Sequence, residues 1–104
     1  MPIETYPYDS AEFLDSDEAM AEYMDEAFKT GDAAFIARSL GTVARARGMS
    51  QIAREAGVSR ESLYRALSEK GNPEFATVLR VINALGLRLT TVAAPDESKT
   101  PAAA

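Results

Sequence analysis

The residues of this sequence that are best suited to chemistry form a short polar run at positions 59–68. Arg60 and Arg65 lie five residues apart in this run, and serine and tyrosine side chains stand around them. Arginine is a frequent bidentate partner of guanine in the major groove of DNA, and hydroxyl side chains bind bases and phosphates. These side chains are therefore suited to binding nucleic acid rather than to making or breaking covalent bonds.

Other kinds of chemistry are restricted by the residues that the chain lacks. Its 104 residues include no cysteine and no histidine. This composition excludes disulfides, thiolate metal sites and the most common general base. Glu18, Glu22 and Glu26 recur every four residues and share a helix face, as an acid–base pair would require. Neither a nucleophile nor an oxyanion donor accompanies them, so we expect no enzyme, no metal and no cofactor.

Residues 49–68 have the pattern that a helix-turn-helix requires. The small residue Ala53 lets two short helices cross closely, and Gly57 follows four residues later, where the turn needs a positive φ. Val58 is placed to anchor the turn in the core. Other apolar residues have the phase of an inward face: Ile52, Ala56, Leu63, Ala66 and Leu67. A helical hairpin that serves stability alone is the alternative, but it leaves the outward arginines unexplained.

Charge is distributed unevenly along the chain, whose net charge is −5. Residues 1–32 hold ten acids and one lysine, a net charge of −9, whereas residues 33–94 hold nine basic residues and four acids, a net charge of +5. Screening limits exposed charges to about 10 Å at ordinary salt, so DNA meets the local charge rather than the total. We find no secretory signal and no apolar run of about 20 residues, and we expect a cytoplasmic protein.

Capping residues and glycines divide the chain into helices that would position these side chains. The predicted helices follow five N-caps: 17–29 after Ser16, 33–47 after Asp32, 51–56 after Ser50, 60–68 after Ser59 and 73–85 after Asn72. The first helix carries a stripe expected to pack on the rest of the protein: Met20, Tyr23, Met24, Ala27 and Phe28. The last helix is expected to bury Phe75, Val78, Leu79, Ile82 and Leu85.

Residues 87–93 break the helical rhythm, and their threonine, valine and leucine predict one short β-strand. A lone strand needs a partner, which would be the same strand of a second subunit, residues 3–8, or another protein. The predicted dimer contacts in this strand are Leu87, Leu89 and Thr91. We divide the chain into an acidic helical extension (1–31), a DNA-binding domain with the strand (32–94) and a flexible tail (95–104).

Most of the chain resembles known protein families. Residues 32–86 resemble the lambda-repressor-like (Xre, or Cro/C1-type) helix-turn-helix domain. About nine-tenths of the chain resembles the HigA-like addiction-module antidote proteins. The resemblance is carried by AEFLDSDEAMAEYM (11–24), IARSLGTVARARGMSQIAREAGVSRESLYRALS (36–68) and GNPEFATVLRVINALGLRL (71–89), and GNPEFATV is its most specific part. It implies a mainly α, lambda-repressor-like bundle with an extra acidic N-terminal helix and one short C-terminal β-strand.

Carried over by position, the resemblance agrees with the outward positions of residues 49–68. Six side chains are expected to read base edges: Gln51, Ser59, Arg60, Ser62, Tyr64 and Arg65. Five flanking side chains are expected to bind phosphates, which position the protein without specifying sequence: Arg47, Ser50, Arg54, Lys70 and Asn72. Glu61 could accept a hydrogen bond from cytosine, but we rank it below the arginines because such a residue is more often a helix-start charge.

The same resemblance implies the antitoxin of a type II toxin–antitoxin module of bacteria. Such an antitoxin neutralises a RelE/ParE-like toxin and, as a homodimer on operator DNA, represses its own operon. These toxins tend to be basic, so we expect the acidic N-terminal third to bind the toxin. The predicted toxin contacts are Glu12, Phe13, Asp15, Glu18, Glu22, Asp25 and Glu26. The alternative is a stand-alone, prophage-type transcriptional regulator without a toxin; either protein would be nucleoid-associated when bound to DNA.

Overall fold

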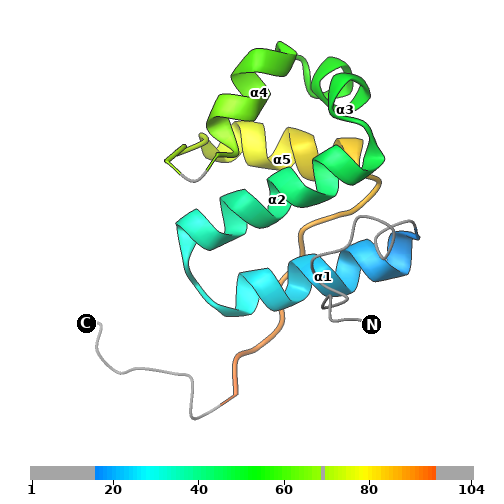
Figure 1. Cartoon of the computed structure of the whole chain (residues 1–104). Helices are drawn as coiled ribbons and strands as arrows, with labels where there is room; N and C mark the ends of the chain where they lie inside the picture. Colours follow the sequence, from blue (N-terminus) through cyan, green and yellow to red (C-terminus); the bar gives the residue numbers. More distant parts are fainter. Residues whose placement is uncertain (1–15, 69, 96–104) are drawn as a thin grey trace, which may run out of the picture.

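The computed structural model describes residues 16–68 and 70–95. This part of the chain contains five α-helices (Figure 1). They are α1 (Asp17–Lys29), α2 (Ala33–Arg47), α3 (Met49–Ala56), α4 (Arg60–Ala66) and α5 (Phe75–Ala84). The prediction of a mainly α protein is confirmed for these residues. None of the helices in this part of the chain is long and apolar enough to cross a membrane.

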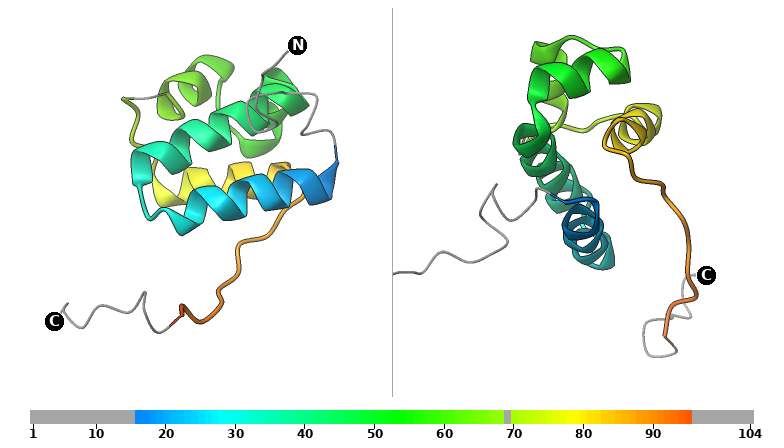
Figure 2. Two further views of the ribbon diagram at one scale, coloured as in Figure 1. Left: turned by 60° about the horizontal axis from the view of Figure 1, so that its bottom comes forward. Right: turned by 90° about the vertical axis from the view of Figure 1, so that its right-hand side faces the viewer.

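The helices pack around one core. α1 and α2 lie side by side and run in opposite directions, joined by a tight turn at residues 30–32 (Figure 1). α3 and α4 form the other end of the molecule, and α5 packs against α3 and α2. The segment that follows α5 runs down past α1 (Figure 2), so the start and the end of the described chain become neighbours.

Three of the predicted helix starts are confirmed by hydrogen bonds of their N-cap side chains. The hydroxyl of Ser16 accepts a hydrogen bond from the backbone N–H of Ala19 at 3.1 Å. The carboxylate of Asp32 accepts from two backbone N–H groups at the start of α2, at 3.1 and 3.2 Å. The hydroxyl of Ser59 accepts from the N–H of Ser62 at 2.9 Å. Each bond satisfies an N–H that has no partner inside its helix.

Other predicted helix boundaries are wrong by one or two residues. α3 begins at Met49 with Gly48 as its N-cap, because the positive φ of Gly48 (112°) both ends α2 and redirects the chain. Ser50 therefore lies inside the first turn and caps nothing. α4 ends at Ala66 rather than at residue 68. α5 begins at Phe75, because Glu74 still has an extended backbone (φ −66°, ψ 152°). Pro73 therefore lies before the helix and not at its first position.

The apolar stripe predicted in α1 is part of the core. Three of its residues are buried, Met20, Met24 and Ala27, and they join buried residues of every other helix in one cluster. The prediction for α5 is wrong at Phe75, which is 67% exposed, whereas Val81 is fully buried. Because α5 starts only at Phe75, this ring lies at the outer end of the helix, beyond the reach of the core.

The predicted β-strand at residues 87–93 is not formed in the structure. The backbone N–H of Leu87 donates to the carbonyl of Ile82 at 3.0 Å, which closes the end of α5. From residue 87 to residue 95 the chain has no regular structure, and the described residues contain no strand. A strand needs the backbone of a second strand, and no described segment supplies one. The suggested partner at residues 3–8 and most of the predicted tail lie outside the described residues.

Gly71 allows the connection between α4 and α5 to approach α4 closely. A Cβ atom added at Gly71 would lie 2.6 Å from the carbonyl carbon of Ala66 and would overlap the carbonyl oxygens of Arg65 and Ala66. We expect Gly71→Ala to lower the free energy of unfolding by roughly 1–3 kcal/mol, as other forced overpacking does. Urea unfolding followed by circular dichroism measures this change. Asn72→Ala, at the exposed neighbour, is the control; an equal effect of both variants would contradict the close approach.

Candidate nucleic-acid interface

α3 and α4 are two short helices joined by a tight turn at residues 57–59. Gly57 adopts the left-handed conformation (φ 79°, ψ 26°) that the sequence pattern required of it. The backbone N–H of Val58 donates to the carbonyl of Ala53 at 3.0 Å, which closes the end of α3. Ala53 and Ala56 are buried, and the half-buried Val58 packs against the core. Small residues and one left-handed glycine thus hold α4 at a fixed angle to α3.

α4 is anchored by one buried residue and exposes most of the others. Leu63 is fully buried, whereas Arg60, Glu61, Ser62, Tyr64 and Arg65 are all exposed. The guanidinium carbon of Arg60 lies 5.1 Å from the centre of the Tyr64 ring, the geometry of a cation–π contact. This contact restricts the long Arg60 side chain on the outer face of the helix. Because the arginine, serine and tyrosine side chains of α4 are exposed, its outer face is rich in hydrogen-bond donors.

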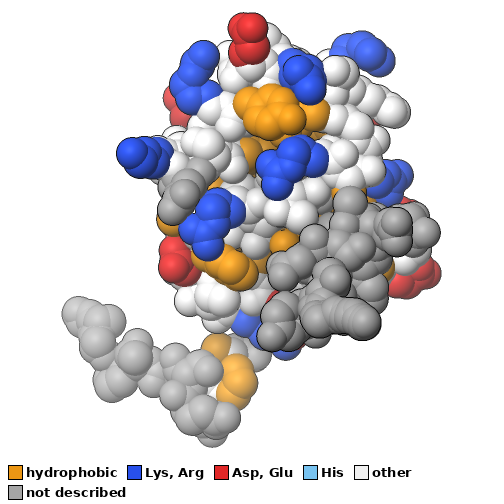
Figure 3. All heavy atoms as spheres, viewed as in Figure 1, with side chains coloured by type: hydrophobic (Ala, Val, Ile, Leu, Met, Phe, Trp, Pro, Cys, Tyr) orange, Lys and Arg blue, Asp and Glu red, His pale blue; other side chains and the backbone are white. Residues whose placement is uncertain are grey.

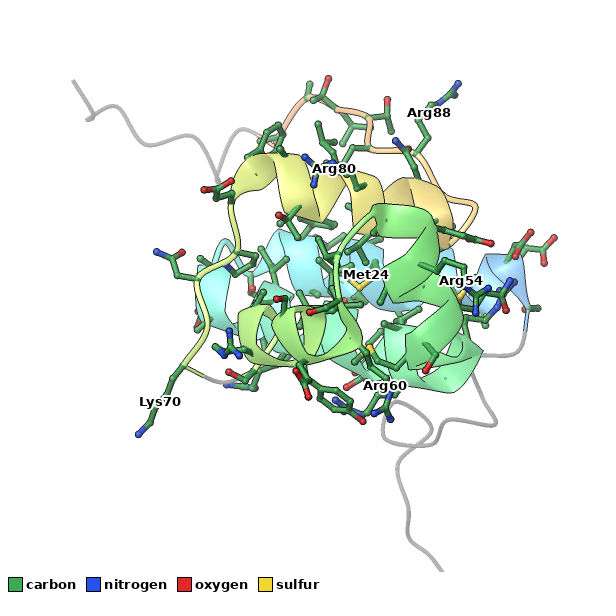
Figure 4. All side chains as sticks on the ribbon, turned by 90° about the horizontal axis from the view of Figure 1, so that it is seen from above. Met24, Arg54, Arg60, Lys70, Arg80 and Arg88 are labelled. Atoms are coloured by element: carbon green, nitrogen blue, oxygen red, sulfur yellow. The ribbon has the colours of Figure 1, made fainter. Side chains whose placement is uncertain are left out.

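The surface around α4 is basic. In the view of Figure 3, blue Lys and Arg side chains surround an orange hydrophobic patch on the upper part of the molecule. Figure 4 shows Arg54, Arg60 and Lys70 pointing outward from α3, α4 and the connection that follows α4, while Arg80 and Arg88 lie on the opposite side. Ser50 and Asn72 are also exposed. Four of the five predicted phosphate ligands thus surround α4 with exposed side chains.

Two of the predicted base-reading residues already have partners within the protein. The amide of Gln51 donates to the carboxylate of Glu55 at 3.2 Å, one turn further along α3. The Ser59 hydroxyl oxygen accepts the N-cap hydrogen bond of α4. To contact a base, Gln51 would exchange its bond to Glu55, whereas the Ser59 hydroxyl keeps its proton for donation. Arg60, Ser62, Tyr64 and Arg65 remain the strongest candidates because the helix presents them together.

Arg47, the fifth predicted phosphate ligand, is directed toward α1. Its guanidinium lies 3.4 Å from a carboxylate oxygen of Asp17 and 3.3 Å from the sulfur of Met20. The two charged side chains are 38% and 70% exposed, so solvent screens their attraction. Arg47 therefore links α1 to the end of α2, a role that the sequence pattern did not show.

Arg45 is a basic residue of the same region that sequence reasoning left out of the site. It stands on α2 four residues after Gly41, and a Cβ atom at Gly41 would lie 3.1 Å from the carbonyl oxygen of Leu67 and 3.4 Å from the Arg45 guanidinium. Arg45 is exposed, so its charge is presented beside the end of α4. A glycine one turn before an arginine on α2 is the signal that could have revealed this close approach.

The exposed face of α1 is acidic. Glu18, Glu22, Asp25 and Glu26 are all exposed. Lys29 lies 3.1 Å from the carboxylate of Glu26 and 3.7 Å from that of Asp25. The hydrogen bond and charge of Glu26, followed by the charge of Asp25, raise the pKa of Lys29 above its usual value. The other three predicted toxin contacts, Glu12, Phe13 and Asp15, lie outside the described residues.

The predicted dimer contacts follow α5. Leu87 and Leu89 are half-buried and pack against the core, while Thr91 is exposed. Within residues 16–68 and 70–95, acidic side chains do not gather in any group that could hold a metal ion.

Fold and surface together define a small helical protein in which basic side chains surround the short helices α3 and α4 at one end and the first helix, at the other end, is acidic. The chain belongs to the family of probable addiction module antidote proteins, whose family model matches residues 4–93. It is 52% identical, over 81 residues, to an uncharacterized protein of Haemophilus influenzae; these residues are 78% of this chain and 84% of that protein. No solved structure matches the chain. The family membership confirms the antidote part of the resemblance.

Proposed function

We propose that the protein is an antitoxin that neutralises a RelE/ParE-like toxin and represses its own operon by binding operator DNA through α3 and α4. The observation that carries the DNA-binding part is the outer surface of α4, where Arg60 contacts the Tyr64 ring and Arg65 is also exposed, on a helix held by Leu63. Membership in an antidote family supports the toxin part. We infer that α3 and α4 act as a lambda-repressor-like helix-turn-helix, which the left-handed Gly57 between two short helices supports.

The proposed docking places α4 in the major groove. A helix of this unit presents its N-terminal residues to base edges, while the preceding helix crosses the phosphate backbone. Arg60 and Arg65 would read guanines, and Ser62 and Tyr64 would bind nearby bases or phosphates. Side chains around α4 would bind the phosphates: Ser50, Arg54, Lys70 and Asn72, with Arg45 added from α2.

A homodimer would bind two half-sites related by two-fold symmetry. Of the contacts predicted from the sequence, Leu87, Leu89 and Thr91, only Thr91 is exposed in the irregular segment after α5, so we propose Thr91 as the dimer contact. Such a dimer requires an inverted-repeat operator with half-sites about one helical turn of DNA apart, or a multiple of that distance. Sedimentation of the protein at operator-binding concentrations measures its oligomeric state, and a monomer there would contradict this part of the proposal.

Coexpression with the neighbouring gene tests the proposed function as a whole. We expect a small basic protein from that gene to copurify with this chain, and we expect footprinting to show protection of the shared promoter. Protection of the promoter without a copurifying partner would instead identify the stand-alone transcriptional regulator. Loss of both results would overturn the proposal.

Lys70→Ala is expected to weaken binding to all DNA sequences to a similar degree. Lys70 is exposed beside α4, and a phosphate contact adds affinity without distinguishing bases. The slope of log K against log salt concentration should become shallower by about 0.9, the value for one phosphate contact. Fluorescence anisotropy over a salt series with operator and scrambled duplexes measures both effects. Arg80→Ala removes the same charge on the opposite side and should leave the slope unchanged (Figure 4).

A further inference from the structure

A groove of about 630 Å³ lies between α1 and the segment that follows α5. Its floor is apolar: buried Met24 and Ile82, with half-buried Phe28, Leu87 and Leu89. Its rim is polar: exposed Glu22 and Asp25 on α1, and exposed Arg88 and Thr90 on the other side. An apolar floor with acidic side chains on the α1 rim and a single cation, Arg88, on the other is the form of a site for an amphipathic segment of a protein.

The wall of the groove formed by residues 87–90 has backbone groups available for a partner. Beyond the hydrogen bond from Leu87 N–H to the Ile82 carbonyl, no backbone group of residues 88–95 is hydrogen-bonded to another described residue. Residues in such a segment can pair with an added extended strand, which supplies the main-chain hydrogen bonds that the wall lacks. This wall can therefore bind a peptide backbone, while the floor binds its apolar side chains.

Charge selects among the segments that could fill this groove. No ion pair forms with Glu22 among the described residues, and Asp25 shares Lys29 with Glu26. Residues 1–15 carry four acids and no basic residue, so the acidic side of the groove repels them. A second copy whose α1 faced this α1 would bring carboxylates to Glu22 and Asp25, and nucleic acid would bring phosphates to them. A partner segment with lysine or arginine facing α1 has the complementary charge.

We propose that this groove binds a basic, amphipathic segment of a partner protein, whose apolar side chains contact Phe28 and Leu89 and whose cations contact Glu22 and Asp25. The proposal rests on the proposed antitoxin function, in which the toxin is that partner. It assigns Leu87 and Leu89 to the partner rather than to a dimer contact. It also restricts the predicted toxin contacts on α1 to one side of the helix, because Glu18 does not line the groove.

Titration of the full chain with a defined peptide tests the groove. The probe is a labelled synthetic peptide of alternating leucine and lysine, with controls in which glutamate replaces lysine or serine replaces leucine. We expect only the leucine–lysine peptide to shift backbone amide resonances of residues 22–28 and 86–90. Glu22→Lys should weaken its binding by about threefold to tenfold, since the variant replaces an attraction with a repulsion. Point variants are used because deleting α1 would remove three core residues.

Two matched controls separate the groove from a general acidic surface. Glu18→Lys makes the same charge change on α1 outside the groove and should have little effect. Leu89→Ser should weaken peptide binding, whereas Val92→Ser, at a position 87% exposed, should not. Equal effects of Glu18→Lys and Glu22→Lys would overturn the proposal. Concentration-dependent shifts at both residues 22–28 and residues 86–90 without peptide would overturn it too, because they would show a second copy in the groove.

The antitoxin function is tested separately in the same variants, by copurification of the neighbour protein and by operator binding. Glu22→Lys should bind the copurifying neighbour protein more weakly and keep operator binding, whereas Glu18→Lys should keep both at the wild-type level. Normal peptide binding without a copurifying neighbour would count against the antitoxin function and not against the groove. A neighbour protein that still binds the Glu22→Lys and Leu89→Ser variants as tightly as wild type would overturn the groove and leave the antitoxin function intact.

Discussion

Replacing Arg60 and Arg65 together with alanine is expected to weaken operator binding by about thirtyfold or more. A bidentate arginine–guanine pair contributes about 1–3 kcal/mol of discrimination, so two pairs contribute at least about 2 kcal/mol. Both side chains are exposed on α4, and neither contributes to the core. The loss should therefore fall on DNA binding and leave the helical signal and the unfolding midpoint nearly unchanged. Fluorescence anisotropy at matched salt measures the affinity, and circular dichroism checks the fold.

Arg80→Ala with Arg88→Ala is the matched control for this double variant. It removes the same charge from α5 and the segment after it, which lie across the molecule from Arg60 in Figure 4. A loss of affinity that depended on net charge alone would be equal in the two double variants. We expect the control to bind nearly as well as the wild type and the Arg60/Arg65 variant to lose its preference for the operator over scrambled DNA. Equal losses would show that α4 is not the helix that reads bases.

Replacing Leu63 with alanine is expected to lower the free energy of unfolding by about 2–5 kcal/mol, the range for buried leucines. Leu63 is fully buried and is the one buried residue within the seven residues of α4. A domain of this size is stable by about 5–15 kcal/mol, so the change removes a large part of the total. Urea unfolding measures the loss. Because α4 would be detached from the core, operator binding should fall with stability.

Ser62→Ala is the control for this stability effect. Ser62 precedes Leu63 on the same helix, and its side chain is exposed, so its replacement should change stability by less than about 0.5 kcal/mol. The comparison separates the anchoring role of Leu63 from any general effect of altering α4. A Leu63→Ala protein as stable as the Ser62→Ala protein would mean that α4 is held by other contacts, Leu67 foremost, which is 3% exposed.

The two proposed binding surfaces are connected mainly by packing. Arg47 joins α2 to Asp17 of α1 at 3.4 Å, but this ion pair is exposed and contributes at most about 1 kcal/mol. The buried side chains of Met20 and Met24 tie α1 to the core more strongly, since each buried apolar side chain contributes about 1.5–3 kcal/mol. A partner bound in the groove therefore contacts a helix that belongs to the same core as α3 and α4.

The sequence by itself determined the features that depend on residues near one another in the chain. The caps Ser16, Asp32 and Ser59 and the left-handed Gly57 set the helix starts and the turn, because their hydrogen bonds and φ angles are local. The helical phase of α1 and α4 showed which side chains are buried, since a period of 3.6 residues defines a face. The outward position of Arg60 followed from the same phase.

Only the tertiary structure decided which faces meet. It placed Arg47 against α1, brought Arg45 beside the end of α4, and left Phe75 exposed at the outer end of α5. It also left the segment after α5 without a strand partner and set it beside α1, where the two form the groove. These features join residues up to about seventy positions apart, and no periodicity or cap records a contact over that distance. Local patterns therefore predicted the helices and the outward side chains of α4. The groove, in contrast, depends on how the helices pack.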